Sequence, residues 1–272
     1  MSENESPPEF DRLNDFEAMT RYETEDALAE GKPVIIPTGS IEQHGHHLPV
    51  GTDTYAVRSV AKRVAARLDG LLVPFSPIGV TPLHMKMGGA ISLRPETYMD
   101  YFDDVIESLI KHGAEQVVIV NWHEVNASSI ETVATRVQDR HQDVTFVIAE
   151  AHFTARDLYA DYHDLTHGGP LEVLPVMGDH PELVHLDRAT DAGEEGHASM
   201  MDDLRRSDNA YPIIPDVRIM YPSGWYGDLS EVEDYDGEEF LERVAEACAD
   251  DVANALEVMG SVDVDDVDDV DE

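Results

Sequence analysis

The chain has 272 residues, of which 18 are lysine or arginine and 57 are aspartate or glutamate, giving a formal net charge of -39. Such a surface repels nucleic acid and anionic membranes, so we expect neither as a partner. The charge indicates either the solvated acidic coat of a halophilic protein or an acidic partner-binding surface, and the even spread of carboxylates favours the coat. The single cysteine, Cys248, excludes an intrachain disulfide and a cysteine-rich zinc site.

The composition of the two ends predicts one domain with polar extensions. We expect residues 1–15 to be a frayed N-terminus, residues 16–260 a single domain, and residues 261–272, which end in VDVDDVDDVDE, an acidic disordered tail. The N-terminus lacks the basic flank and apolar stretch of a signal peptide, and no run of about 18 apolar residues occurs. We therefore expect a cytoplasmic protein without a membrane span.

The predicted elements alternate between strand and helix. Residues 34–37 are a β-branched apolar run typical of a buried strand, and a loop follows through Asp53. Apolar residues at helical spacing from Val57 to Leu68 predict a helix, residues 71–75 a second strand, and residues 81–90 a glycine-rich loop. The pattern so far is typical of a β-α-β unit.

The second half of the pattern repeats this alternation. Residues 95–113 predict a helix that begins at Pro95 and ends at Gly113, and residues 116–120 predict a fully apolar strand. A helix through residues 130–137, a strand at 144–149 and a long amphipathic helix at 241–259 follow. Continuous apolar strands separated by helices predict an α/β fold with a parallel sheet covered on both faces.

Five ligating side chains crowd the loop after the first strand, in the segment IPTGSIEQHGHHLPVGTDT: Glu42, His44, His46, His47 and Asp53. Carboxylates together with imidazoles are the ligand set of zinc, manganese and iron sites. The alternative is a polar surface loop with unrelated histidines.

A second histidine-bearing segment, NWHEVNASS, follows the apolar strand at 116–120 and places His123 and Glu124 at its end. Ligands in parallel sheets bind outside the carboxyl ends of the strands, and both segments lie at such ends. His123 by itself would fit a histidine satisfied at a strand end. Its pairing with the first loop favours a metal role.

Several further residues are candidates for the surroundings of such a site. His84 in the glycine-rich loop, Trp122 and Trp225 could line a substrate pocket, although either tryptophan also fits ordinary core packing. Glu194, Glu195 and His197 follow a long irregular stretch, which is typical of functional or disordered loops. We expect five further histidines to lie on the surface: His141, His163, His167, His180 and His185. No nucleotide-binding glycine motif or nucleophile-elbow motif occurs.

Four ordered stretches resemble the creatininase family. They are IPTGSIEQHGHHLPVGTDT, HMKMGGAISLRPET, VVIVNWHEVN and SGWYGDLSEVEDYDGEEF, and the resemblance runs from about residue 20 to 260. It implies a three-layer αβα sandwich with a mostly parallel sheet, often assembled as a homo-oligomer, possibly a hexamer. It also implies a binuclear centre of zinc, manganese or iron that acts on cyclic amides or formamides.

Carried over by motif, the resemblance implies that Glu42, His44, Asp53 and His123 are metal ligands and that Asp53 bridges two divalent ions. Two positions depart from the family pattern. The glutamate that follows the motif histidine by two places in creatininase is Val125 here, with Glu124 one place out of register. The family also carries the motif His-Ala-Gly-x-x-Glu-Thr-Ser. The nearest segment in this chain is DAGEEGHAS, in which Asp191 takes the place of the histidine.

The predicted function is hydrolysis of a non-peptide C–N bond in a small cyclic amide or formamide, through a metal-bridging hydroxide. Glu124, Glu195 and His197 are the predicted catalytic residues, and a carboxylate, Glu124 or Glu195, would carry the proton to the leaving nitrogen. Two alternatives remain: a formamide hydrolase of archaeal flavin or deazaflavin biosynthesis, and an inactive metal-binding homologue.

Overall fold

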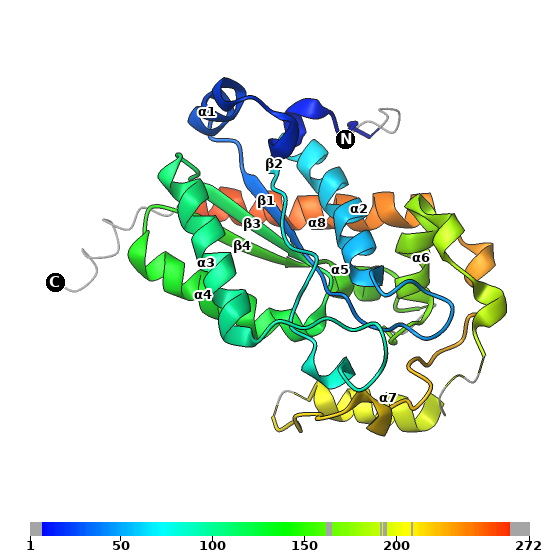
Figure 1. The fold of residues 1–272 in the computed structure, drawn as a ribbon. Helices are drawn as coiled ribbons and strands as arrows, with labels where there is room; N and C mark the ends of the chain where they lie inside the picture. The colour runs from blue at the N-terminus through cyan, green and yellow to red at the C-terminus, as the bar shows by residue number, and fades with distance from the viewer. Residues whose placement is uncertain (1–6, 162–164, 191, 193–194, 208, 262–272) are drawn as a thin grey trace.

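The computed structural model describes residues 7–161, 165–190, 192, 195–207 and 209–261. Its centre is a four-stranded parallel sheet in the order β2-β1-β3-β4 (Figure 1). The strands are β1 (Val34–Thr38), β2 (Leu71–Leu72), β3 (Gln116–Asn121) and β4 (Thr145–Glu150). The expected strand at 71–75 thus shortens to two residues. The parallel direction follows from β-α-β connections, which return the chain to the same end of the sheet before each new strand.

Helices cover both faces of this sheet, as a parallel sheet with apolar residues on both sides requires. The helices in chain order are α1 (Arg21–Ala29), α2 (Thr52–Arg67), α3 (Pro95–Lys111), α4 (Ala127–Arg140), α5 (Ala151–Leu158), α6 (Pro170–Asp179), α7 (Glu195–Arg205) and α8 (Gly237–Gly260). One apolar core lies between the sheet and α3 and α4, and a second lies between the sheet and α2, α6 and α8. The predicted three-layer α/β architecture is confirmed.

Alternate residues of each strand enter the two cores, which is the consequence of the two-residue period of a strand. Val34 and Ile36 of β1 face the core under α3, whereas Ile35 faces the core under α2. The same division holds in β3, where Val117 and Ile119 oppose Val118. The register Ile36↔Ile119 holds the ends of β1 and β3 side by side, so the loops that follow them open at the same edge.

The structure differs from the expected pattern mainly in its helices. Helix α2 begins at Thr52 instead of Val57, so Asp53 lies in its first turn and not in a loop. Helices α5, α6 and α7 occupy a stretch that the sequence pattern left irregular, and α6 carries Pro175 in its interior. No helix in the described part of the chain combines the length and apolar character that crossing a membrane requires.

Two groups of predicted features fall outside the described residues. The first is the pair of extreme ends, residues 1–6 and 262–272. The second comprises His163, Asp191 and Glu194.

Candidate metal centre

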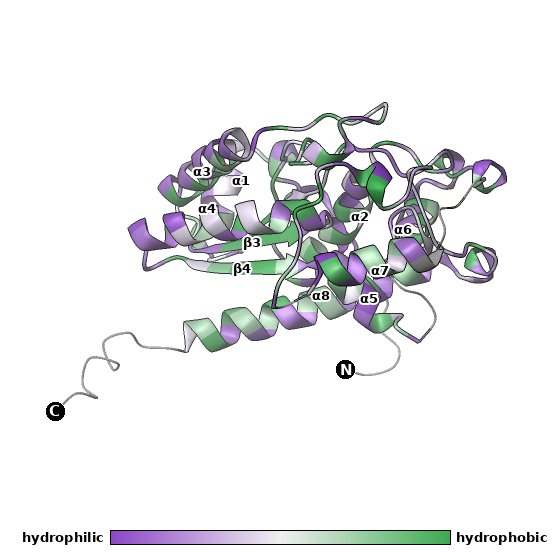
Figure 2. Cartoon of the chain, turned by 90° about the horizontal axis from the view of Figure 1, so that it is seen from below, coloured by the Kyte–Doolittle hydropathy of each residue, from purple (hydrophilic) through white to green (hydrophobic). Residues whose placement is uncertain are grey.

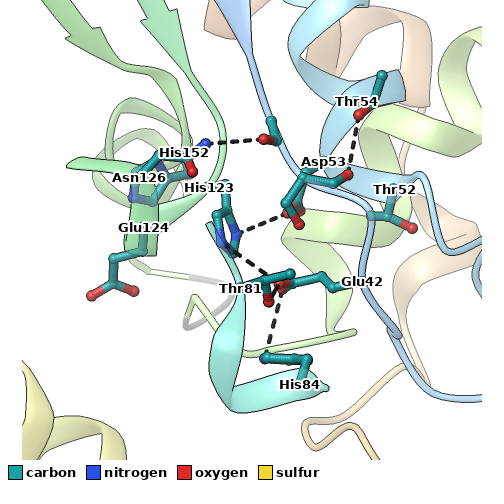
Figure 3. Close-up of polar contacts among 12 residues, drawn as sticks. Glu42, Thr52, Asp53, Thr54, Thr81, His84, His123, Glu124, Asn126 and His152 are labelled. Atoms are coloured by element: carbon teal, nitrogen blue, oxygen red, sulfur yellow. Dashed lines mark hydrogen bonds and ion pairs between the residues drawn. The ribbon is translucent and has the colours of Figure 1, made fainter. Parts of the chain in front are cut away.

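The loop after β1, the first turn of α2 and the end of β3 bring four ligating side chains together. Glu42 and His44 lie in the loop, Asp53 lies in the first turn of α2, and His123 follows β3 by two residues. Figure 3 shows Glu42, Asp53 and His123 side by side. All four are buried, with 5% of His123 exposed and less of the others. A carboxylate in a first helical turn also faces the positive end of the helix dipole, which favours the charged form of Asp53.

Asp53 stands between two imidazole rings and offers one oxygen to each. Its Oδ1 lies 3.2 Å from Nε2 of His44, and its Oδ2 lies 3.0 Å from Nδ1 of His123. Two of these four atoms, His44 Nε2 and Asp53 Oδ2, are buried without a hydrogen bond. Buried polar atoms are almost always satisfied, so their convergence indicates a site for cations. The expected meeting of Asp53 and His123 is therefore present.

Glu42 extends the cluster towards the glycine-rich loop. Its Oε2 lies 3.6 Å from Nε2 of His123 and accepts a hydrogen bond from the Thr81 hydroxyl. Its Oε1 lies 3.8 Å from Nε2 of His84, a buried residue of the 3-10 turn η3 (Pro82–His84). The polar contacts in Figure 3 show this chain of side chains from Asp53 through His123 to Glu42 and His84.

Two further residues of the cluster come from the start of α6. His44 Nε2 lies 3.5 Å from Oε2 of Glu172, and Nδ1 of His167 lies 3.9 Å from both Glu172 Oε2 and Glu42 Oε1. The rings of His167 and His44 stack with centroids 4.4 Å apart. The expectation that His167 lies on the surface was wrong, because the chain turns into α6 directly above the metal-ligand loop.

Main-chain carbonyls orient three of the histidines. His44 Nδ1 lies 3.1 Å from the Glu42 oxygen, His123 Nε2 lies 3.1 Å from the Val80 oxygen, and His167 Nε2 lies 2.7 Å from the Gln43 oxygen. A neutral ring that donates through one nitrogen presents a lone pair on the other. The free nitrogens all face the carboxylates, which is how metal-binding histidines are held.

The electrostatics of the cluster show an excess of negative charge. Burial alone lowers the pKa of His44, but the carboxylates of Glu172 and Asp53 outweigh burial and raise this pKa to about 10. Burial and neighbouring charges raise the pKa of Glu172 to about 7. The pKa of Asp53, in contrast, lies well below its usual value, because the charges of His44 and His123 outweigh the burial of its carboxyl group. Two buried carboxylates, Glu42 and Asp53, and the partly buried carboxylate of Glu172 form, with the imidazole rings, a donor set suited to divalent cations.

Three overlapping groups of these residues have ligand atoms within 4.8 Å of one another. One contains Glu42, Asp53 and His123, and the second contains His44, His167 and Glu172, whereas the third combines Glu42 with His84 and His167. Asp53 contacts His44 as well as His123, so it joins the first two groups. The candidate ligand atoms thus form overlapping groups that Asp53 connects.

A family model described as "Creatininase: Creatinine amidohydrolase" matches residues 17–252. The chain belongs to the creatininase family. Members of this family are metal-dependent hydrolases, and solved creatininases include a manganese form and a Zn–Zn form. The recognised resemblance is therefore confirmed, and the chain is a hydrolase by family.

The relatives with established activities act on different substrates. The chain is 31% identical over 193 residues to the creatinine amidohydrolase of Pseudomonas putida. The matched segment covers 64% of this chain and 74% of that protein. The chain is 25% identical over 235 residues to the mycofactocin precursor peptide peptidase of Mycobacterium ulcerans (strain Agy99), covering 81% and 84%. A crystal structure of creatininase superposes with a TM-score of 0.75 at 23% identity, over 89% of this chain and 97% of that one, which shows the shared fold.

The family pattern accounts for the two residues that the sequence analysis missed. Its His-Ala-Gly-x-x-Glu text has a histidine and a glutamate five places apart, and His167 and Glu172 in HGGPLE have that spacing. The comparison with DAGEEGHAS was misplaced by about two dozen residues. The signal available in the sequence was His167 followed by two glycines and Pro170. Proline is typical of a helix start, and the glycines allow the chain to pass close to the metal-ligand loop.

Glu124 points away from the ligand cluster (Figure 3). It lies in the 3-10 turn η4 (Glu124–Asn126), and its carboxylate pairs with Arg205 at 2.8 Å and with Arg206 at 3.0 Å. These two guanidinium groups outweigh burial and lower the pKa of Glu124 to about 2. The structure therefore does not bring Glu124 to the position of a metal ligand or a proton carrier, and gives it the role of an anchor for the end of α7.

The other predicted catalytic and pocket residues are dispersed. His197 is exposed, with Nε2 2.9 Å from the Ile219 oxygen, and Glu195 begins α7 with its side chain outside the described part. Trp122 is buried in the core, with Nε1 lacking a hydrogen bond. Trp225 packs edge-on against His47 and donates to the Thr190 oxygen. Among the predicted pocket residues, His84 faces the metal-ligand candidate Glu42, with Nε2 3.8 Å from its Oε1, whereas Trp225 contacts His47.

Proposed function

We propose that this protein is a two-metal amidohydrolase that cleaves a C–N bond of a small amide. The observation that supports it most directly is Asp53, whose two oxygens face different histidines at 3.2 and 3.0 Å. A carboxylate that serves two ions typically bridges them at a separation of about 3.5–4 Å. Among the described residues, no other carboxylate has its two oxygens within 3.2 Å of two different histidines, since both oxygens of Glu107 face the same ring, that of His141.

The ligand atoms divide into two sets around Asp53. Glu42 and His123 would hold one cation with Asp53, while His44 and Glu172 would hold the other with the same carboxylate. Divalent ions in such a pair polarise an amide carbonyl and make water nucleophilic near neutral pH. Zinc, manganese and iron all suit this mixture of imidazole and carboxylate ligands.

His167 is the residue best placed to move a proton. Its Nε2 is held by the Gln43 carbonyl, which leaves Nδ1 free and 3.9 Å from carboxylates of both proposed ligand sets. Burial and the neighbouring histidine charges lower its pKa well below the ordinary value, so the ring is neutral and can accept a proton from the attacking water. It would then donate this proton to the leaving nitrogen.

His84 is suited to hold a substrate rather than a metal. Gln43 Oε1 accepts from the Gly45 amide, so its Nε2 donates to Nδ1 of His84 at 3.2 Å. The hydrogen of the neutral His84 ring is then on Nε2, which faces the cluster. Burial lowers the pKa of His84 to about 3, which keeps the ring neutral. A neutral N–H donor at this position would orient a carbonyl oxygen of the substrate.

An inactive metal-binding homologue is the less favoured function. That alternative rested on Val125, which replaces a ligating glutamate of creatininase. Glu172 supplies a partly buried carboxylate 3.5 Å from His44, so the second ligand set does not lack an acidic member. The relatives that span most of this chain include a peptidase that acts on the mycofactocin precursor peptide. Linear peptides are therefore a candidate substrate class for this protein, beside cyclic amides and formamides.

The test is a hydrolysis screen in molar salt with zinc, manganese or iron added to metal-stripped protein. Small lactams, formamides and short peptides serve as substrates, and the His123→Ala variant is measured beside the wild type. The matched control is His141→Ala, since His141 is a histidine paired with Glu107 away from the cluster. We expect His123→Ala to abolish metal-dependent hydrolysis and His141→Ala to keep it. Equal activity of both variants would refute the proposal.

A further inference from the structure

Strand β4 forms an open edge of the central sheet. It pairs only with β3, so its other side has no strand beside it in the described part of the chain. Thr145 donates its amide to the Glu115 oxygen on the β3 side, and amides point to alternate sides along a strand. The amides and carbonyls of Phe146 and Ile148 therefore point outward, where another strand can reach them. Figure 2 shows β4 between α4 and α8.

Strand β4 lacks the features that usually protect such an edge. Natural edges are short, covered, or interrupted by proline, lysine or a bulge. The opposite edge follows this rule, because β2 has only two residues and the bridge Asp15↔Leu72 places the N-terminal segment against it. Strand β4 has six residues in continuous register with β3 and contains no proline or lysine. An edge of this kind is suited to the addition of a strand from another protein.

An apolar hollow lies on each side of this edge. One of about 510 Å³ opens between β4, α5 and α8, and one of about 540 Å³ opens between β4 and α4. Val147, Ala149 and Phe153 line the first, and Phe146 and Ile148 line the second. Side chains of an added strand would alternate between the two sides of the sheet. They would therefore enter both hollows.

The charged side chains of both hollows are acidic. The first is lined by Glu150, Asp157 and Asp251 and the second by Glu131 and Asp139, and no lysine or arginine of the described chain lines either. Within the described residues, Asp157 alone of the five has a basic partner, Arg156 at 2.8 Å. Residues 144–149 carry no charge themselves. Four carboxylates without a lysine or arginine partner thus flank an uncharged strand.

The contact of Arg156 shows which chemistry these hollows accept. Its guanidinium group lies over the Phe153 ring, 4.6 Å from the centroid, and pairs with Asp157. Long basic side chains lay their methylene stems on apolar surface and keep the charged group in water. Further side chains of this kind would cover the apolar linings while their charges reach the unpaired carboxylates.

We propose that the β4 edge binds an extended basic segment of a partner protein, which adds a fifth strand to the sheet. Main-chain hydrogen bonds to Phe146 and Ile148 would supply affinity, and the carboxylates would select lysine and arginine over acidic side chains. The six residues of β4 span roughly 20 Å at about 3.3 Å per residue, which sets the length of the bound segment. Neither kind of contact involves a proposed metal ligand.

Peptide binding in molar potassium chloride tests the edge. The Debye length is then about 3 Å, so diffuse attraction to the acidic surface is screened. The probe is a fluorescent peptide of alternating arginine and valine, as long as β4. One control peptide has every backbone amide methylated, and the other has glutamate in place of arginine. Fluorescence anisotropy should show that the probe binds at least tenfold more tightly than either control.

Three results would overturn the proposal. Equal binding of the methylated peptide, or displacement of the probe by equimolar spermidine, would reveal a site for small cations that does not use the strand edge. Absence of binding, as when a second copy of the chain already covers β4, would exclude a partner strand.

Variants of the protein locate the bound peptide. Ile148→Pro removes an outward amide without breaking the pairing with β3, and we expect at least tenfold weaker binding, whereas Ile148→Val should bind as the wild type does. Glu131→Gln combined with Asp251→Asn leaves the strand intact and should weaken binding about fivefold. Asp26→Asn combined with Asp100→Asn, two exposed carboxylates of α1 and α3, should leave it unchanged.

The carboxylate variants decide the matter where circular dichroism shows that Ile148→Pro has altered the fold. Equal affinity of the two carboxylate double variants would overturn the charge selection, and with it the proposed basic partner. A folded Ile148→Pro protein that binds the probe as tightly as the wild type would overturn the added strand.

Discussion

Asp53 is the residue on which the proposed metal centre depends. Its first-turn position in α2 and its contacts with two imidazoles stabilise the charged carboxylate despite complete burial. In the metal-free protein Glu172 and Asp53 raise the pKa of His44 to about 10, and Glu42 and Asp53 raise that of His123 to about 9. Protons therefore substitute for cations at this site, and metal binding must displace them.

These shifts predict opposite pH dependences for the metal-free and metal-loaded protein. The folded-state pKa values of His44 and His123 lie above the ordinary value of 6.5, so the stability they contribute is complete below pH 6.5 and is lost as pH rises through about 9–10. We expect the Tm of the chelator-treated protein to fall over this range. The extra Tm that metal confers should instead rise from pH 6 to 8. Parallel curves with and without metal would contradict this linkage.

Glu172 and Glu124 distinguish the structural account from the sequence-based one. Glu172→Gln removes a partly buried carboxylate 3.5 Å from His44, and we expect metal content to fall from about two ions per chain to about one. The affinity for the second ion should weaken at least tenfold, because about tenfold is the smallest typical loss when a residue that only supports a metal ligand is mutated. Glu124→Gln should keep both ions, because its partners are Arg205 and Arg206. Metal analysis of the two variants that gave the reverse result would restore Glu124 as the ligand.

At the scale of elements, the contact between the first metal-ligand loop and α2 positions the site. Gly39 follows β1, and a Cβ atom built on it would lie 2.8 Å from the main-chain carbonyl of Asp53. Backbone cannot yield as a flexible side chain can, so a larger residue must push the start of α2 away from the sheet. The loop and the helix can hold their ligands together only because this position has no side chain.

Gly39→Ala should therefore displace Asp53. We expect a loss of about 1–3 kcal/mol in the free energy of unfolding, the usual range for overpacking, together with weaker metal binding. Gly88→Ala is the matched control, because a Cβ atom there meets nothing within 4 Å. Urea unfolding and metal titration measure both effects. Equal behaviour of the two variants would show that the close approach does not position Asp53.

The elements also show how far sequence patterns reached. Apolar runs predicted β1, β3 and β4, and helical spacing predicted α3 and α8, because these elements bury continuous or periodic faces. The pattern missed α6, whose start and interior carry Pro170 and Pro175. Prolines and paired glycines are typical of loops, whereas the apolar residues of α6 are buried against α2 and α8, which a local pattern does not show. His167 and Glu172 were lost with it.

For the whole molecule, the sheet explains why some ligands could be predicted and others could not. Glu42, His44 and His123 follow parallel strands, so the general position of ligand sites at strand ends was sufficient to bring them together. The His167–Glu172 pair approaches from a helix on one face, across a distance in sequence that no local pattern encodes. Glu124 was misassigned because its arginine partners lie about 80 residues away.

The net charge of -39 is also a property of the whole molecule. The ion pairs of Arg63 and Arg67 with Glu242 join α2 to α8, but acidic residues outnumber basic ones about threefold, so most carboxylates cannot have a basic partner of their own. Screening by molar salt would relieve this repulsion, and the measurements proposed above are therefore best made at high ionic strength. Low salt would lower the stability of the fold, and weaken any association between chains, for reasons unrelated to the metal site.

The number and position of bound metal ions test the central claim most directly. Crystals grown with manganese should show two anomalous peaks about 3.5–4 Å apart, with Asp53 between them, Glu42 and His123 on one side, and His44 and Glu172 on the other. Metal analysis of the same protein should give two ions per chain. A single ion, or ions bound away from Asp53, would contradict the account.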